Sequence, residues 1–229
     1  MSFETAIRTT EILLALAFIQ QSLEHLEGPK EQQRIFLPRI MLSVLLILGI
    51  SAPWVCILLL IHGIMILRRF DGPYNGGADR MSLLILACLC LIYFIPSLKW
   101  QEYIFGYLAL QVILSYFISG VFKVINPEWW TGQALQDLFR FSAFPVSEAL
   151  RAWANCPRVF LCIASWLAIL FELLFPLVLL NQSALLIGLC AAIVFHLGNI
   201  YLFGFNRFLW VWLAAYPSVI WLQGQLVSN

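Results

Sequence analysis

Lys123 is the strongest candidate in the chain for a residue that does chemistry, because it ends an apolar run and precedes a polar one within the segment 116–138. An amine at the mouth of a membrane helix is costly to desolvate, so its position requires an explanation. In one interpretation the lysine extends to the membrane surface above an aromatic belt that contains Trp129 and Trp130. In the other it accepts a proton or holds an anion in a membrane pocket that the two tryptophans cover.

Glu172 lies in the middle of the apolar run ILFELLFPLV. A carboxyl group inside a membrane helix is a candidate functional group whose partner has to be found. It is either a neutral, protonated acid bonded to a neighbouring helix or the partner of a cation. Lys123 is one such cation, although we expect Glu172 to lie nearer the middle of the membrane. Pro176, four residues later, cannot bond the carbonyl of Glu172, which predicts a local kink.

Two histidines, His62 and His196, fall within apolar runs at a similar expected depth of ~10 Å from the same side. Such a pair could ligate a haem or a chlorin. We favour packing and hydrogen bonding for His62 and a place in a ligand pocket for His196, which Asn199 follows at a spacing of three. No metal site is predicted elsewhere, since the six cysteines lack the spacing of a metal site or a disulfide framework.

The composition indicates a protein that lies in the lipid bilayer. Of 229 residues, 62% are hydrophobic and only 11% are charged, which excludes an ordinary soluble domain. A net charge of +1 gives no basis for nucleic-acid binding. At ~20 residues per membrane helix, the length allows about eight helices in a single domain over residues 1–229.

The apolar runs predict an all-α integral membrane protein, a bundle of about eight transmembrane helices with one amphipathic helix at the membrane surface. Residues 7–24 contain a short apolar core and form either a first span, which we favour, or a helix lying on the surface. The surface helix is predicted over 133–141, where apolar residues recur at spacings of three and four. The other predicted spans are 35–50, 54–67, 81–96, 103–124, 159–180, 185–203 and 208–222.

The basic residues are distributed unevenly across this predicted topology. All but Arg8 and Lys99 of the 13 lysines and arginines fall on one side, which should therefore face the cytoplasm, with a bacterial inner membrane as the expected location. Lys123, Asn75 in its glycine-rich loop and the paired tryptophans lie on this same side. Because binding and catalytic residues often lie on loops that a rigid scaffold positions, we expect the functional site on this basic side of the membrane.

The sequence YFISGVFK, which ends at Lys123 and is followed by Trp129 or Trp130, Gly132 and Leu135, resembles the membrane domain of the vitamin K-dependent gamma-carboxylase, the HTTM family. The segments 75–79, 171–176 and 195–217 are similar to further patterns of that family, and the likeness covers nearly the whole chain in order. In the carboxylase a lysine of this motif is the base that deprotonates vitamin K hydroquinone. The resemblance therefore implies an all-α membrane fold with Lys123 as base.

The chain also departs from the carboxylase pattern. Phe122 stands where the carboxylase has a second lysine, and residues 77–80 lack the histidine of its loop. The large lumenal domain of the carboxylase has no counterpart in these 229 residues. The charge distribution places the motif at the cytoplasmic side, whereas the carboxylase acts on the lumenal side.

These observations lead to two functional expectations, and the sequence does not decide whether the protein is an enzyme. In the first, a pocket binds or acts on a quinone-like, lipid-soluble molecule, with Lys123 as base or anion holder. In the second, the chain is a non-catalytic subunit of a larger membrane complex for electron transfer or light harvesting. The ligand-binding residues expected in the first case are Trp129, Trp130, Glu172, His196, Asn199 and Asn75.

Overall fold

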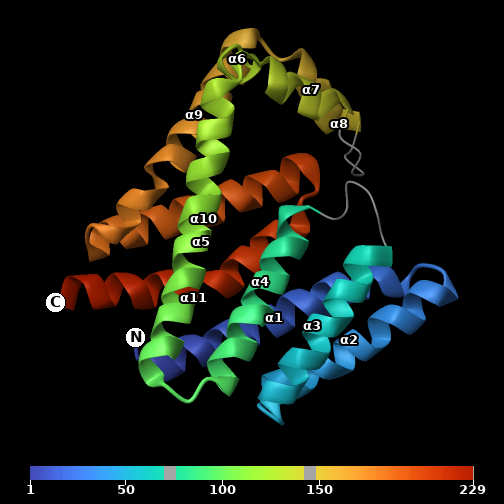
Figure 1. Ribbon diagram of the computed structural model, residues 1–229. Coiled ribbons are helices and arrows are strands. Elements are labelled where there is room, and N and C mark those ends of the chain that lie inside the picture. The colour runs from blue at the N-terminus through green and yellow to red at the C-terminus, as the bar shows by residue number, and fades with distance from the viewer. Residues whose placement is uncertain (70–75, 142–147, 229) are drawn as a thin grey trace. The chain divides into compact units, whose positions relative to one another are not determined.

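The computed structural model describes residues 1–69, 76–141 and 148–228, and the regular structure of these residues is helical throughout (Figure 1). The helices are α1 (Phe3–Leu26), α2 (Lys30–Leu48), α3 (Ala52–Arg69), α4 (Gly77–Phe94), α5 (Leu98–Ile125), α6 (Pro127–Trp130), α7 (Gln133–Phe141), α8 (Glu148–Arg151), α9 (Arg158–Leu174), α10 (Gln182–Phe203) and α11 (Asn206–Ser228), with 3₁₀ helices η1 (Ala152–Asn155) and η2 (Phe175–Leu179).

Within the described residues, five helices are long and apolar enough to cross a membrane: α3, α4, α5, α9 continued by η2, and α10. This finding confirms an all-helical protein with several candidate membrane spans. The total of about eight spans stays a prediction, as does the choice between a span and a surface helix for the first segment. That segment forms the 24-residue helix α1, which Ser2 caps by accepting a hydrogen bond from the Thr5 amide.

The change of helix type after Leu174 follows from Pro176. The α-helical part of α9 ends at Leu174, and the chain continues as η2. Proline has no N–H with which to bond the carbonyl of Glu172, so the regular ladder stops there. The sequence predicts a kink at this point, and the structure shows a change from α-helix to 3₁₀ helix there.

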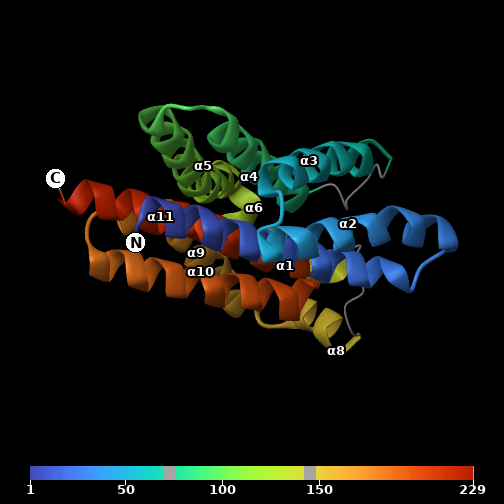
Figure 2. The same ribbon diagram turned by 90° about the horizontal axis from the view of Figure 1, so that it is seen from below.

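The contacts divide the chain into two compact units, and the first contains residues 1–110 and 210–224. In this unit α1 and α2 pack against each other along their length and lie side by side (Figure 2). The helix α3 packs against α2, and α4 packs against α3. Large buried side chains fill the core of this unit: Leu14, Phe18, Leu46, Leu59, Ile85 and Leu89.

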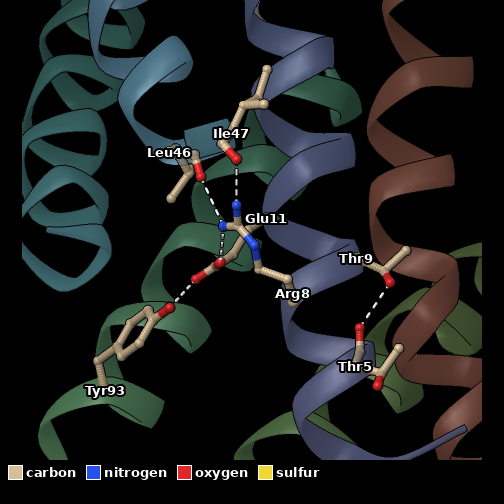
Figure 3. A network of polar contacts seen from close by, with 7 residues as sticks. All are labelled: Thr5, Arg8, Thr9, Glu11, Leu46, Ile47 and Tyr93. Carbon is tan, nitrogen blue, oxygen red and sulfur yellow. Dashed lines mark hydrogen bonds and ion pairs between the residues drawn. The ribbon is translucent and has the colours of Figure 1, made fainter. Parts of the chain in front are cut away.

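A partly buried polar network joins α1, α2 and α4 inside this unit (Figure 3). The guanidinium of Arg8 donates hydrogen bonds to the carbonyl oxygens of Leu46, at 2.8 Å, and Ile47, and to the carboxylate of Glu11, at 2.8 Å. The hydroxyl of Tyr93 donates to the other oxygen of Glu11. Arg8 thus bonds carbonyls in the last turn of α2, of which that of Leu46 also accepts a hydrogen bond from the amide of the capping residue Gly49 at 3.1 Å.

The second unit contains residues 111–209 and 225–229, and therefore the C-terminal part of α5 with α6 to α10. The helix α7 has the bounds predicted from the sequence, and Phe139 on its apolar side is buried with Leu161 and Phe203. Leu135 and Leu138 pack against the same cluster. The apolar side of α7 therefore packs on protein, and the location of this helix at a membrane surface stays a prediction.

Candidate functional site

The candidate site is built on one face of the C-terminal part of α5. Tyr116, Ser119, Gly120 and Lys123 recur at spacings of three, one and three, which places them on the same side of an α-helix. Figure 1 shows α9 running beside this part of α5, with α6 following at its end. The residues on this face therefore meet side chains from α9.

The central contact of the site is an ion pair between Lys123 and Glu172. The Lys123 Nζ lies 2.6 Å from Oε2 and 2.8 Å from Oε1 of the carboxylate. The side chains are 12% and 4% exposed, so the pair is almost fully buried. The amine is directed at a carboxylate of the neighbouring helix, and the direct pairing that the sequence left open is present.

Ser119 completes the hydrogen bonding of this pair. The Lys123 ammonium donates to Ser119 Oγ at 2.7 Å, and the serine hydroxyl lies 3.1 Å from Glu172 Oε1, to which it donates. An ammonium has three N–H donors, and two carboxylate oxygens and one hydroxyl accept them here. Charge-assisted bonds of this kind are the stronger ones in proteins.

Gly120 allows α5 and α9 to approach each other beside the ion pair. A Cβ atom at this position would lie 2.9 Å from the backbone nitrogen of Leu173 and 3.1 Å from the Cβ of Glu172. These distances are shorter than a van der Waals contact between such atoms, so a larger side chain would push the helices apart. The glycine therefore sets the distance at which Glu172 reaches Lys123.

The two tryptophans of α6 have different surroundings. The Lys123 Nζ lies 4.9 Å from the centroid of the Trp129 ring, which places the cation over the face of the aromatic system. The indole N–H of Trp130 donates to the carbonyl of Val124 at 2.8 Å, and its side chain is half-exposed. Trp129 thus contacts the amine, whereas Trp130 satisfies a carbonyl in the last turn of α5.

The segment that carries these tryptophans is fixed to the start of α9. Gly132 has a φ of 75°, and a Cβ there would lie 2.7 Å from the Cys162 nitrogen. The Arg158 guanidinium donates to the carbonyl of Thr131 at 3.3 Å, and the Cys162 thiol to that of Trp130 at 3.0 Å. These contacts hold α6, and Trp129 with it, beside the ion pair.

His196 of α10 is buried and lies in a second polar contact on the same face of α5. Its Nε2 is 2.6 Å from the hydroxyl oxygen of Tyr116, and either group donates according to the histidine tautomer. The rings of Phe171 and Phe175 pack against Tyr116, and Phe195 packs against Phe171 and His196. An aromatic cluster therefore surrounds this pair.

The remaining predicted residues are not among the contacts that the structure shows around Lys123. Asn199 follows His196 on α10 and is half-buried, and its backbone carbonyl accepts a hydrogen bond from the amide of Phe205. His62 lies in the first unit, where its Nε2–H donates to the carbonyl of Ile35 at 2.9 Å, in line with the preferred hydrogen-bonding role. Asn75 lies outside the described residues.

In the described part of the chain, no cluster of three or more His, Cys, Asp or Glu side chains could hold a metal ion. The structure thus brings Lys123, Glu172 and Trp129 together in one site and gives His196 a partner two helical turns away along α5. Haem or chlorin ligation by His62 and His196 stays untested.

The sequence did not identify Ser119 or Tyr116 as site residues. Both lie at helical spacing before Lys123, four and seven residues upstream, which is the signal that could have found them. A serine or a tyrosine within an apolar helix is common, however, and neither carries a charge whose burial demands a partner. The contacts themselves are needed to identify them.

In a comparison with models of protein families, the model of the HTTM domain matches residues 82–222. The match covers more than half of the 229 residues and includes Lys123, Trp129, Glu172, His196 and Asn199. No curated protein and no solved structure matches the chain.

Proposed function

The chain belongs to the HTTM domain family, related to the membrane domain of vitamin K-dependent carboxylase, and from this membership and the buried ion pair we infer that this integral membrane protein binds a lipid-soluble molecule with an acidic hydroxyl group. A hydroquinone is the ligand class that fits both the family membership and the buried ion pair. The single observation that carries the proposal is the Lys123–Glu172 pair, held by Ser119 and covered by Trp129.

A buried ion pair is a poor means of stabilising a helix bundle. The desolvation of both charges offsets most of their attraction, and apolar residues of similar size are often as stable or more stable. In a membrane the cost of a charge is at least as high. A pair kept at 4% and 12% exposure therefore supports a role in handling a charged or ionisable ligand.

The proton balance of the pair defines what it can do. In the ion-paired state it holds an ammonium and a carboxylate, and it can take up one further proton. When a hydroquinone hydroxyl transfers its proton, the ligand O–H bond breaks and its electron pair stays on the ligand oxygen. A new O–H bond forms on the Glu172 carboxylate, and the site gains one positive charge as the ligand gains one negative charge.

After this transfer the Lys123 ammonium loses its carboxylate counter-ion and pairs with the ligand oxyanion. Trp129 favours the ammonium form of Lys123 before and after the transfer, since the face of an aromatic ring attracts a cation and not a neutral amine, and the transferred proton therefore goes to Glu172. The expected role of Lys123 as base thus becomes a role of the pair: Glu172 takes the proton, and Lys123 holds the anion. No oxidant or further reactant is needed for this step.

The other predicted ligand residues extend the proposed pocket along α5. His196 and its partner Tyr116 offer hydrogen-bonding groups two turns from the amine, where a second oxygen of a quinone-like ring could bind. Asn199 and Trp130 complete the pocket in this proposal. We further propose eight membrane spans, with the basic loops and Lys123 at the cytoplasmic side of a bacterial inner membrane.

The proposal is tested by titrating purified full-length protein in mild detergent with a short-chain hydroquinone and following tryptophan fluorescence. The native protein should bind the probe, and the double variant Lys123→Met/Glu172→Leu should lose this binding while it stays folded. Lys99→Met, an exposed lysine elsewhere, is the matched control and should bind as the native protein does. Equal binding by the native protein and the double variant would refute the proposal.

A second outcome distinguishes the rival expectation. If the protein co-purifies with a stoichiometric partner from native membranes and this partner persists in the double variant, the chain acts as a subunit and the pair has no ligand-handling role. The proposed function instead requires that hydroquinone binding is a property of the isolated chain.

A further inference from the structure

A groove at the start of α2 combines two cations with apolar side chains. It has a volume of about 400 Å³ and is lined by Leu26, Lys30, Gln33, Arg34 and Leu37. It lies in the first unit, at the connection between α1 and α2, and shares no residue with the site around Lys123. Nothing in the proposed function uses it.

The two cations of the groove are available to a ligand. Neither Lys30 nor Arg34 has a hydrogen-bond or ion-pair partner among the residues that the structure describes, and both are exposed. Glu27 of the connecting segment and Glu31 of the first turn of α2 do not line the groove, and Glu31 bonds Arg69 at 3.5 Å. An ammonium beside a guanidinium is a favourable combination for a phosphate group.

The wall of the groove is held in place by internal contacts. The side-chain amide of Gln33 donates to the carbonyls of Leu26, at 2.9 Å, and Gly28, at 3.1 Å. The rings of His25 and Phe36 stack at 4.1 Å just beside it, with 13° between their planes. The cations therefore project from a fixed connection between the two helices, and a ligand need not order this connection on binding.

An apolar stripe continues from the groove along the same side of α2. Residues 30, 34, 37, 41, 44 and 48 follow one another at spacings of four and three, which places them on one face of the helix. The last four are Leu37, Met41, Val44 and Leu48, and they are 43% to 64% exposed. From Leu37 to Leu48 the helix rises about 16 Å, close to the ~15 Å hydrocarbon depth of one leaflet.

This face thus presents a cationic end followed by an apolar stripe of leaflet length, and we propose that it binds one anionic phospholipid. The phosphate lies between Lys30 and Arg34, and an acyl chain covers Leu37 to Leu48. Free phosphate would use only the cationic end, and a zwitterionic lipid would bring its own cation to the groove. The proposal does not depend on any ligand at Lys123.

Native mass spectrometry of the full-length protein in mild detergent tests this inference, with phosphatidylglycerol and phosphatidylcholine as separate probes. The native protein should bind one phosphatidylglycerol in preference to phosphatidylcholine. Lys30→Gln/Arg34→Gln should weaken that binding roughly 30-fold, the effect of two cations near an anionic headgroup. Arg68→Gln/Arg80→Gln removes two exposed cations of the same unit and should leave it unchanged.

A further variant tests the apolar part of the site. Met41→Gln should lower the affinity for phosphatidylglycerol several-fold, since it makes the acyl path polar. Equal affinity in Lys30→Gln/Arg34→Gln and the native protein, or equal binding of the two lipids, would overturn the proposal. So would full displacement of the lipid by millimolar inorganic phosphate together with no effect of Met41→Gln, because the site would then recognise phosphate alone.

Discussion

Replacing Lys123 by methionine should destabilise the protein strongly, and replacing Glu172 by leucine in addition should restore most of the loss. In the single variant the Glu172 carboxylate, 4% exposed, keeps only the Ser119 hydroxyl as a partner. An uncompensated buried charge of this kind costs about 3–5 kcal/mol. The two lost bonds to the carboxylate, at 2.6 and 2.8 Å, lead to a similar figure at about 1.5–3 kcal/mol each.

The double variant Lys123→Met/Glu172→Leu buries two apolar side chains where two charges had been. Since replacing a buried ion pair by apolar residues is close to neutral, its stability should lie within about 1–2 kcal/mol of the native protein. The coupling energy between the two positions should therefore be at least ~3 kcal/mol, far above the value of independent sites. A coupling energy of this size distinguishes two charges that interact directly from two charges that are only near each other.

The assay is thermal unfolding in mild detergent, followed by the fluorescence of the nine tryptophans. For a chain of this size the single variant should unfold about 6–20 °C below the native protein. Lys99→Met is the control, because this exposed lysine should contribute no more than about 0.5 kcal/mol. If the double variant loses as much stability as the sum of the two single variants, the Lys123–Glu172 ion pair is not a feature of the folded protein.

Two further variants test the packing around the polar groups by the same melting assay. Gly120→Ala should destabilise by about 1–3 kcal/mol, because its Cβ would lie 2.9 Å from the backbone of α9, whereas Gly198→Ala, which meets no atom within 4 Å, should be neutral or slightly stabilising. Equal melting temperatures of these two variants would contradict the close helix approach. Tyr93→Phe should cost about 1.5–3 kcal/mol by removing the hydroxyl bonded to Glu11, and Tyr103→Phe, at an exposed position, less than about 0.5 kcal/mol. Equal melting temperatures of Tyr93→Phe and Tyr103→Phe would show that the network in Figure 3 does not stabilise the protein.

The helices could be predicted from the sequence because long apolar runs have few other structures in a membrane. The predicted spans 103–124 and 185–203 lie within α5 and α10, which begin five and three residues earlier than predicted and end within one residue of the predicted positions. The start of α2 was missed by five residues, since its first turn is charged and carries no apolar periodicity. The start of α4 was missed for the same reason, because Gly77 to Arg80 are small or polar.

The members of the site could be predicted in part, but their contacts could not. Lys123 and Glu172 stood out because a charge in an apolar helix is costly. Their expected depths argued against a direct pair, since depth was counted along the helix axis and the long lysine stem was not included. Ser119 carries no such cost, so its helical spacing from Lys123 was the one signal that could have pointed to it.

The contacts over long sequence distances had no signal in the sequence at all. Tyr116 and His196 are 80 residues apart, and nothing in either helix specifies that they meet. Arg8 bonds backbone carbonyls of α2, and carbonyls are present at every residue. Such contacts follow from the packing of helices, which periodicity alone does not determine.

The central claim is that the Lys123–Glu172 pair accepts the proton of a lipid-soluble hydroquinone and holds the resulting anion. The ultraviolet absorption spectrum of a short-chain hydroquinone bound to the native protein near neutral pH tests it most directly. The account predicts the spectrum of the hydroquinone monoanion in the native protein and of the neutral molecule, if any binds, in the Glu172→Gln variant. A neutral spectrum in the native protein at saturating probe would contradict it.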